Sequence, residues 1–426
     1  MFDVIIIGGG AAGFFAAIHI AETSTNLKVA IIERGKEVLT KVKVSGGGRC
    51  NVTHAEFDPS ELVKSYPRGE KELLGPFHTF SSGDTVAFFE KRGVLLKIEK
   101  DGRMFPVTNS SQTIIDCFLK EIDRLGITVL KNSSVVAFAP SQSKENLGGW
   151  MVESYKKTYQ AKKILVATGS NPKIWKMLEG LGHTIESPVS SLFTFNIKDD
   201  RIKGIQGVST NAYIQVKSKN NNGGRVVINL KSRLPQIPIL ESEGPLLITH
   251  WGMSGPAILK LSAWGAKILN NYKYNFKIIV NWLPDYHIGG VLSLLMEIKE
   301  VEAKKTILRT NAVDIPRRLW INLVKASGIS DKTKWGDVSK IQLQNLTDQL
   351  TKSEFFVEGK STFKEEFVTA GGVDLKEINF KTFESKIHPN LYFAGEIINV
   401  DAITGGFNFQ NAWTGAYIAA KAIASS

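Results

Sequence analysis

Short apolar runs alternate with helical patterns along the N-terminal part of the chain. Residues 4–7 and 28–32 are short β-branched runs, and residues 11–22 between them have the composition of a helix. A glycine-rich loop is expected at 41–51, and further helical patterns cover 85–92 and 111–125. Strand-like runs follow at 127–130, 135–138, 150–154 and 163–167. Strands that alternate with helices are typical of an α/β fold.

The pattern changes at about residue 188, where short strand-like runs are separated by Gly and Asn turns. These runs are 193–197, 212–216, 226–230 and 246–249, with a turn at 220–224. They favour a small antiparallel sheet or barrel. Helical patterns then cover 257–269, 288–298, 316–325 and 338–350. A strand pair, 354–358 and 365–369, is expected to return to the barrel. The chain ends in a buried strand at 390–394 and a helix at 408–424.

The simplest architecture is an α/β fold in which a discontinuous Rossmann-like, nucleotide-binding domain carries two insertions. Its two segments are expected at 1–188 and 362–426. The first insertion is a small β-barrel domain at 189–255, completed by 353–361. The second insertion is a helical domain at 256–352.

The composition is that of an ordinary globular protein, with 426 residues, 43% hydrophobic residues and a mean hydropathy of −0.06. No apolar run reaches the roughly 18 residues that a transmembrane helix needs. Residues 2–21 have no basic segment before them, so a signal peptide is disfavoured and we expect a cytoplasmic protein. Cys50 and Cys117 are the only cysteines, which excludes a disulfide scaffold and a Cys-based zinc site. We expect no metal.

The charge is the unusual figure, because 53 Lys and Arg against 41 Asp and Glu give a net charge of +12. A basic chain raises the hypothesis of nucleic-acid binding. The excess is spread in pairs such as Lys156 with Lys157, however, and no stretch holds five like charges. This spacing favours a solvated surface that steers an anionic ligand over a nucleic-acid partner. We therefore expect a small-molecule substrate and no membrane partner, and the oligomeric state stays open.

The first chemical signal is the G-x-G-x-x-G motif at residues 8–13. Gly8 permits a tight turn after the strand, Gly10 lets the backbone approach a pyrophosphate, and Gly13 allows close packing of helix and strand. Glu33 follows the next strand-like run, at the distance from Gly13 where such folds place a carboxylate that accepts hydrogen bonds from an adenosine ribose. The acid also disfavours a 2′-phosphate, and therefore NADP, at this site.

Two later segments favour FAD over NAD as the bound dinucleotide. Residues 166–170 end an apolar strand with a small-residue turn, and residues 393–396 end another before 405–410 open the last helix. A C-terminal strand, acid and helix that return to an N-terminal Rossmann motif are typical of two-dinucleotide-binding flavoproteins. We expect the backbone of Gly395 and Glu396, together with residues 399–401, near the ribityl and pyrophosphate. The helix N-terminus from Gly406 is expected at the pyrimidine edge of the flavin.

The loop at 45–51 (SGGGRCN) is expected to run toward the flavin ring. A disulfide reductase is disfavoured, because Cys117 lies far beyond Cys50 in sequence, within a predicted helix. Arg49 could lower the pKa of the Cys50 thiol, but burial against the cofactor is the favoured role of this cysteine. Arg49 could also pair with a phosphate or an anionic substrate.

Four separated segments together resemble one family, the BaiN-like bacterial flavoproteins, which include aminoacetone oxidase-type enzymes. The segments are KVKVSGGGRCNVTH (41–54), DGRMFP (101–106), THWGMSGPAILKLS (249–262) and the tail between 367 and 420. The resemblance spans essentially the whole chain. It implies FAD, a cytosolic oxidoreductase and the three-part architecture described above. His54 and Asn399 depart from the residues more common in the family, which are Asn and Asp.

By motif position, the resemblance implies FAD contacts from Gly8, Gly10, Gly13, Glu33, Arg49, Cys50, Asn51, Gly395, Glu396, Gly406, Asn408 and Gln410. The other positions predicted beside the cofactor are Ala11, Ala12, Arg34, Lys43, Ser45, Gly46, Gly48, Val135, Ala167, Thr168, Gly169, Gly372, Asp401 and Phe409.

The resemblance implies an FAD-dependent oxidoreductase, which we expect to oxidise a small amine such as aminoacetone and to be reoxidised by O2. A second G-x-G-x-x-G is absent, which favours an oxidase over an NAD(P)H-dependent reductase of an unsaturated or carbonyl substrate, although NAD(P)H can bind transiently without it. A flavin-containing RNA-modifying or RNA-binding protein is the third alternative. By residue type the candidate catalytic groups are His250, His54 and Arg103, and each has a structural role as its alternative. Trp251 and the 253–255 turn are candidates for the substrate pocket, unless Ser254 caps a helix there.

Overall fold

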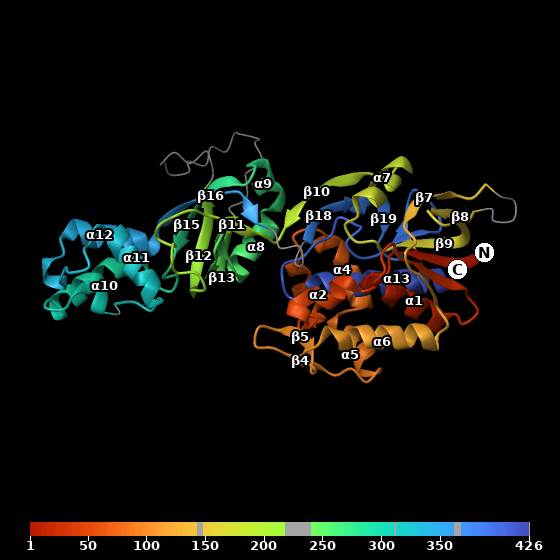
Figure 1. Cartoon of the computed structure of the whole chain (residues 1–426), viewed down its shortest axis with the longest axis horizontal. Helices are drawn as coiled ribbons and strands as arrows, with labels where there is room; N and C mark the ends of the chain where they lie inside the picture. The colour runs from red at the N-terminus through yellow and green to blue at the C-terminus, as the bar shows by residue number, and fades with distance from the viewer. Residues whose placement is uncertain (143–147, 218–239, 311, 362–367, 426) are drawn as a thin grey trace. The chain divides into compact units, whose positions relative to one another are not determined.

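The computed structural model describes the chain except for residues 143–147, 218–239, 311, 362–367 and 426. It divides into two compact units (Figure 1). Unit 1 combines residues 1–189 with 364–426, and unit 2 is residues 190–363. Within the described residues, every helix is too short or too polar to span a lipid bilayer.

The main sheet of unit 1 is a parallel core extended by antiparallel strands. Its order is β19 (Ile378–Asn379), β20 (Glu384–Ser385), β21 (Leu391–Phe393), β9 (Thr158–Val166), β1 (Phe2–Ile7), β2 (Val29–Ile32) and β6 (Thr128–Leu130). β7 (Val135–Pro140) and β8 (Trp150–Ser154) extend it from β9. The strands β21, β9, β1, β2 and β6 run parallel, and Ile5 of β1 lies opposite Ala30 and Ile164. The carboxyl ends of these strands therefore meet at one edge, which is where α/β sheets bind ligands.

Two long helices pack together over this sheet, α1 (Ala11–Thr23) and α13 (Phe407–Ser425). Phe15 of α1 lies 5.1 Å from Trp413 of α13, between ring centroids, and α6 (Ser111–Arg124) adds Phe118 at 5.7 Å from Trp413. These apolar side chains are fully buried, so the helices share the core of the sheet. The other helices of unit 1 are α2 (Thr40–Gly48), α3 (Pro59–Leu62), α4 (Glu70–Thr79), α5 (Ser82–Glu90) and α7 (Pro172–Gly180).

Two small sheets complete unit 1. β3 (Thr53–His54), β5 (Arg103–Pro106) and β4 (Leu96–Ile98) form one, and β10 (Ile185–Ser191) pairs with β18 (Val368–Val373) in the other. Short 3-10 turns lie at Val63–Ser65 and Leu375–Glu377.

Unit 2 is built on an antiparallel sheet of seven strands. Its order is β16 (Ser353–Glu358), β15 (Asn275–Asn281), β12 (Ser209–Lys217), β13 (Glu241–Ile248), β14 (Gly252–Ser254), β11 (Thr194–Asn196) and β17 (Lys360–Ser361). β11 also contacts β16, so the sheet curls toward a barrel.

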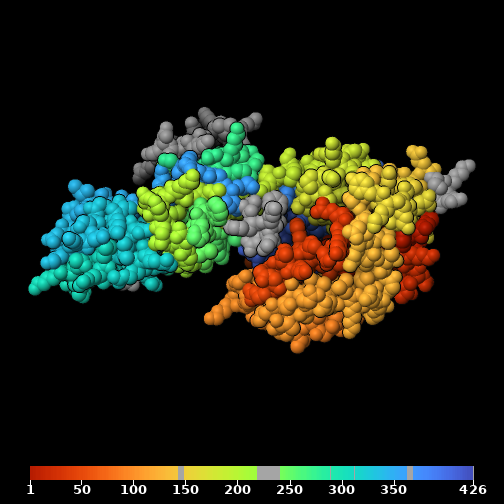
Figure 2. All heavy atoms as spheres, viewed as in Figure 1, coloured from red at the N-terminus to blue at the C-terminus, as the bar shows by residue number. Residues whose placement is uncertain are grey.

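The helices of unit 2 share one hydrophobic core with this sheet. They are α8 (Pro256–Trp264), α9 (Ala266–Asn271), α10 (Ile288–Val301), α11 (Arg317–Ala326) and α12 (Lys340–Thr351), with 3-10 turns at Ile307–Arg309 and Trp335–Asp337. α10 to α12 form a lobe beside the strands (Figure 2). One buried cluster nevertheless contains both Phe195 and Ile278 of the sheet and Leu295 and Trp320 of the lobe.

The predicted α/β class and most predicted elements are confirmed, with three corrections. The loop expected at 41–51 begins as helix α2, and its backbone leaves helical geometry only at Ser45, Gly46 and Gly47. The single helix expected at 257–269 is two helices that meet at Gly265. The strand expected at 354–358 is β16 of the barrel, but residues 368–369 lie in β18, which pairs with β10, so β17 joins the barrel in place of the second strand. Residues 365–367 of that expected strand lie outside the described residues. The run 226–230 and the turn 220–224 lie outside the described residues.

Candidate functional site

The glycine loop between β1 and α1 is crowded at Gly8 and Gly13 but leaves open space at Gly10. A side chain at Gly8 would place its Cβ 2.4 Å from the Ala167 carbonyl oxygen, and one at Gly13 would lie 2.0 Å from that of Gly8. A Cβ at Gly10 would meet no atom within 4 Å, and no side chain caps the N-terminus of α1 beside it. Ala11 and Ala12, in the first turn, therefore present backbone N–H groups next to an open position, which suits a phosphate.

Glu33 lies at the carboxyl end of β2, against the glycine loop. Its Oε2 accepts a hydrogen bond of 2.8 Å from the Gly9 amide, and its Oε1 accepts one of 2.7 Å from the Gly35 amide. The backbone oxygen of Glu33 also accepts from the Ser133 amide, which brings the start of β7, and buried Val135, close to this acid. Arg34 is exposed. The carboxylate is thus held where a ribose beside the loop could reach it.

An ion pair that sequence reasoning missed joins Lys41 of α2 to Glu396, which follows β21. A Cβ at Gly169 would lie 3.6 Å from the Glu396 carboxylate and 3.9 Å from the Lys41 Nζ, so the pair stands beside the turn after β9. Ala167 and Thr168 of that turn were predicted at the site. The two charges are 355 residues apart in sequence, so no local pattern could pair them.

The glycine-rich segment at the end of α2 is exposed at Gly46, Gly47 and Gly48, which have φ between 58° and 83°. A Cβ at Gly46 would lie 2.9 Å from the Phe105 ring, whereas positions 47 and 48 are open. Ser45 donates to the Val42 carbonyl, and the exposed Lys43 accepts at its carbonyl from Ser111.

Cys50 ends this segment and is fully buried. Burial raises the pKa of its thiol to about 12. The thiol therefore stays protonated near neutral pH, which favours the packing interpretation over a reactive thiolate.

Arg49 and Arg103 are both held by carboxylates of unit 1. Arg49 donates to Glu99 at 2.6 Å and lies 3.9 Å above the Phe105 ring. Arg103 donates to Asp101 at 2.8 Å and pairs with Glu99 at 3.3 Å. These contacts fix the loop between β4 and β5, which favours the structural role that the sequence left as the alternative for Arg103.

The start of α13 is held by a set of polar side chains. In the orientation that satisfies its amide, Asn51 accepts at 2.9 Å from the Gly406 amide. Asn408 bonds both the amide and the carbonyl of Ala402. Gln410, fully buried, accepts from Thr53 at 2.7 Å and from Thr85 at 2.9 Å. These side chains position the helix N-terminus by bonding to the protein.

Asp401, predicted beside the cofactor, has a carboxylate that bonds to the protein. It is fully buried and bonded to the Arg68 guanidinium. Phe409, predicted at the cofactor, stacks on Trp413 with 5.5 Å between ring centroids.

Two buried polar atoms of unit 1 have no hydrogen-bond partner among the described residues, Thr369 Oγ1 and Asn399 Oδ1. Thr369 is in β18, and Asn399 follows Gly395 and Glu396 and donates its amide to the Val373 carbonyl. Gly372, also in β18, approaches the Ile397 carbonyl so closely that a Cβ at this position would lie 2.6 Å from the carbonyl oxygen. Unpaired buried oxygens are costly, so a ligand with hydroxyl or N–H groups is a fitting partner for them.

These features fit FAD: an open glycine loop, an acid at the end of β2 and unpaired oxygens in β18 and after β21. A dinucleotide along the carboxyl edge would place its phosphates at Gly10 and its ribityl chain toward Gly395 and Asn399.

The two candidate histidines lie in different units. In unit 1, His54 Nε2 is 3.0 Å from the Asp101 carbonyl oxygen, and the ring stacks on Phe407 at 4.6 Å. His54 Nδ1 is buried with no partner among the described residues. In unit 2, exposed His250 lines a hollow of ≈ 400 Å³ with Lys198 and Lys203.

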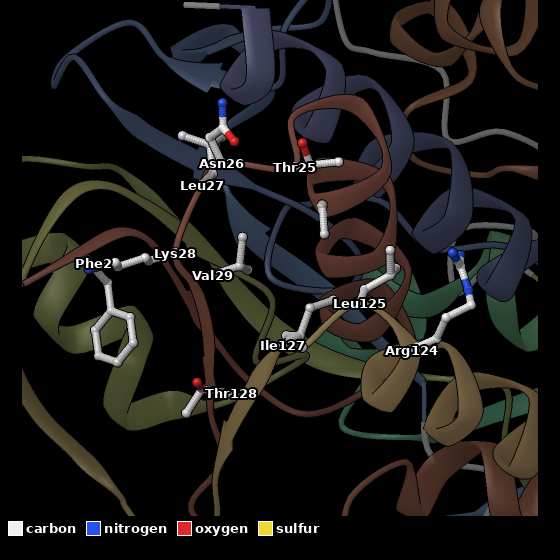
Figure 3. Close-up of a pocket in the computed structure, with 12 residues that line it drawn as sticks. Phe2, Thr25, Asn26, Leu27, Lys28, Val29, Arg124, Leu125, Ile127 and Thr128 are labelled. Atoms are coloured by element: carbon white, nitrogen blue, oxygen red, sulfur yellow. The ribbon is translucent and has the colours of Figure 1, made fainter.

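A hollow of ≈ 480 Å³ in unit 1 is separate from the predicted cofactor site (Figure 3). Phe2, Lys28, Val29 and Thr128 line it at the amino ends of β1, β2 and β6. Because ligands of α/β sheets bind at the carboxyl ends, the geometry does not support a cofactor here.

The model of the family described as HI0933-like protein Rossmann domain matches residues 2–422. Two curated relatives match along nearly their whole length. The ribosomal RNA dihydrouridine synthase of Haemophilus influenzae is 28% identical over 98% of both chains. The 3-dehydro-bile acid delta(4,6)-reductase of Clostridium scindens is 26% identical, also over 98% of both.

Among solved structures, the 3-ketosteroid-delta4-(5alpha)-dehydrogenase of Rhodococcus jostii RHA1 has a TM-score of 0.51 at 12% identity. The match covers 100% of this chain and 97% of that one, which shows a shared fold.

Proposed function

Since this chain belongs to the HI0933-like Rossmann family of FAD-dependent oxidoreductases, we propose that it reduces a carbon–carbon double bond conjugated to a carbonyl, with a uridine of ribosomal RNA as its substrate. NAD(P)H is the proposed electron donor. One hydride adds to C6 of the uracil ring, one proton adds to C5, and NAD(P)+ is the oxidised product.

The full-length match to the ribosomal RNA dihydrouridine synthase carries this proposal. Dihydrouridine is uridine with two hydrogens added across C5=C6, a bond conjugated to the C4 carbonyl. The name of the second relative, a delta(4,6)-reductase, also describes the reduction of double bonds. One chemistry therefore joins both relatives, and it supports a reductase for this chain.

The distribution of charge along the chain supports RNA as the substrate class. Residues 190–363 contain 24 of the 53 Lys and Arg but 14 of the 41 Asp and Glu, so unit 2 carries +10 and unit 1 carries +2. The spacing along the whole chain had favoured a generally solvated surface. Once the charge is assigned to units, one of them has the excess that a phosphate backbone attracts.

FAD, when bound, supplies hydride transfer between the nicotinamide and the substrate. The residues of this chain bind and orient it. The Gly10 loop accommodates phosphate, Glu33 accepts from ribose hydroxyls, and Asn399 Oδ1 accepts from the ribityl chain. Cys50 is buried and its thiol is protonated near neutral pH, so we assign it no redox role.

Amine oxidation with O2 as acceptor stays a prediction of the family resemblance. Both proposals require bound FAD, and they differ in the source of electrons: the amine itself in an oxidase, a nicotinamide in a reductase. This difference makes them separable by one measurement.

The test uses the full chain loaded with FAD. Under anaerobic conditions we expect NADPH or NADH to bleach the flavin absorbance, and aminoacetone to leave it unchanged. Ribosomal RNA from a strain without dihydrouridine in that RNA, incubated with enzyme and nicotinamide, should gain two hydrogens at one uridine by mass spectrometry. A Gly10→Val variant is the matched control. Its Cβ meets no protein atom within 4 Å, so the protein should fold, but the side chain would occupy the space proposed for the phosphates of FAD.

Bleaching by aminoacetone, with none by nicotinamide, would overturn the reductase. Bleaching by nicotinamide without dihydrouridine in any RNA fraction would overturn RNA as the substrate.

A further inference from the structure

Unit 2 presents a large exposed aromatic side chain that neither its core nor the predicted cofactor site uses. Trp251 lies between β13 and β14 and is 58% exposed. Most tryptophans of this chain are buried, and five of them are among its largest fully buried side chains. An exposed tryptophan is therefore unusual here and suggests a binding role.

The turn that carries Trp251 is held by hydrogen bonds on both sides. The Thr249 amide donates to the Gly252 carbonyl at 2.8 Å, and the Ile197 amide donates to the Trp251 carbonyl at 2.9 Å. Gly252 has a φ of 145°, and a Cβ there would lie 2.2 Å from the Phe195 carbonyl oxygen. The backbone that presents the indole to solvent is already fixed, so binding should cost little further conformational entropy of the backbone.

A hollow lies beside this turn. The chain neighbours of Trp251, His250 and Gly252, line it together with Lys198 and Lys203. Its acids are partly neutralised by cations: Arg201 donates to Asp199 at 2.7 Å, and Lys203 lies 4.0 Å from Asp200. The lining holds two lysines and two aspartates, and the adjacent Arg201 brings the local charge to +1, within a unit that carries +10.

We propose that this turn and hollow bind single-stranded RNA, with the Trp251 indole stacked on an unpaired base and Lys198 and Lys203 at the neighbouring phosphates. The proposal rests on the proposed function for its substrate class. Aromatic side chains stack on bases of any sequence, because every base has a π-face, and lysines contact the backbone as point charges. A fully paired duplex offers no unstacked base, so it should bind more weakly.

The stacking part is tested with the FAD-loaded full chain and a fluorescein-labelled oligouridine strand, by anisotropy. Trp251→Ala should weaken binding about tenfold, and Trp251→Phe should restore most of the affinity because it keeps a ring. Trp264→Ala is the matched control, since Trp264 is also exposed (40%) in unit 2 but, unlike Trp251, has no chain neighbour that lines the hollow. It should bind as the wild type does.

The electrostatic part is tested by the salt dependence of the same binding. The double variant Lys198→Ala/Lys203→Ala should lower the slope of log affinity against log salt by about two. Lys71→Ala/Lys120→Ala removes the same charge from exposed positions of unit 1 and should leave the slope unchanged.

Equal affinities for wild type and Trp251→Ala, or equal losses for Trp251→Ala and Trp264→Ala, would overturn the proposal. Tighter binding to a duplex than to the single strand would do the same. The proposed function fails separately, if the wild-type protein forms no dihydrouridine. A wild type that forms dihydrouridine while Trp251→Ala keeps full affinity and turnover refutes only this RNA site.

Discussion

The Glu33 carboxylate and the Gly9 amide are joined by a hydrogen bond of 2.8 Å that ties the end of β2 to the loop after β1. A second bond, to Gly35, holds the other carboxylate oxygen. The acid is therefore oriented by backbone donors on both sides before any cofactor is present. A nucleotide that binds here meets a carboxylate already held in place.

Replacement of Glu33 by alanine should weaken FAD binding by roughly 10- to 100-fold, because a hydrogen bond to a charged group contributes about 1.5–3 kcal/mol. Titration of the apoprotein with FAD, followed by flavin fluorescence, measures the change. Glu37→Ala removes a nearby exposed acid and serves as the control. An unaltered affinity in Glu33→Ala would show that the carboxylate does not contact the cofactor.

Gly10 and Gly13 should respond differently to a side chain, although both belong to one motif. Gly10→Val should leave the melting temperature of the apoprotein nearly unchanged and abolish the flavin absorbance, since its Cβ meets open space and its φ of −94° suits any residue. Gly13→Ala should cost about 1–3 kcal/mol of stability or more, because its Cβ would strike the Gly8 carbonyl. If Gly10→Val retains full FAD, the phosphates do not lie at this loop.

Cys50 should resist alkylation in the native protein. Burial raises the pKa of Cys50 to about 12 and that of Cys117 to about 11, so almost no thiolate exists at about pH 8. Mass spectrometry after iodoacetamide treatment should find no label in the native protein and two labels after unfolding. Rapid single labelling of the native protein at Cys50 would instead point to a reactive thiol at the flavin site.

The buried pair of Arg68 and Asp401 should be costly to break from one side. Asp401→Ala leaves a guanidinium whose side chain is 13% exposed without this carboxylate, at an expected cost of about 3–5 kcal/mol in the free energy of unfolding. Urea denaturation measures it. Glu61→Ala, at the exposed pair with Lys64, should cost less than about 1 kcal/mol. Similar costs for the two variants would mean that the Asp401 pair does not hold the turn before α13.

His19 should make the protein less stable in acid. It packs among Phe15, Phe88 and Tyr417, and burial, with the Arg92 charge, lowers its pKa to about 3. The unfolded chain binds a proton at His19 near pH 6.5, whereas the folded protein does not until about pH 3. The contribution of neutral His19 to the free energy of unfolding is therefore complete above pH 6.5 and is lost as the pH falls from 6.5 toward 3. At about pH 5 the loss should be about 2 kcal/mol.

Urea unfolding of wild type and His19→Phe at about pH 7.5 and pH 5 isolates this term, because other groups contribute equally to both proteins. The variant should lose less stability on acidification than the wild type. Parallel losses would show that His19 is protonated in the folded state.

The Rossmann half of the fold could be predicted because its signals are local. The strand before Gly8, the helix after Gly10 and the acid at the end of the next strand are set by spacing within one βαβ unit. α4 was missed, because Gly75 and Pro76 interrupt its pattern while Leu73 and Phe77 still bury one face. Here tertiary packing outweighs helix propensity.

The polar contacts of the site could not be predicted in the same way. Thr53 and Gln410 are 357 residues apart, and Arg68 and Asp401 are 333 apart. Such pairs depend on how the two segments of unit 1 meet, which no local pattern encodes. For this reason the sequence predicted Asp401 and Gln410 beside the cofactor but gave no sign of their bonds to Arg68 and Thr53.

The split of unit 1 also has a consequence for synthesis. β9 acquires β21 as a partner, and α1 is covered by α13, only after residues 364–426 have left the ribosome. Until then the apolar face of α1 and one edge of the sheet lack their partners in the nascent chain. Unit 2, a continuous segment, can fold earlier. Residues 395–399 of the predicted flavin site belong to the same late segment, so we expect the flavin to enter only after α13 has docked on α1. A chain stalled before residue 364 should present to chaperones and proteases the surface that α13 covers.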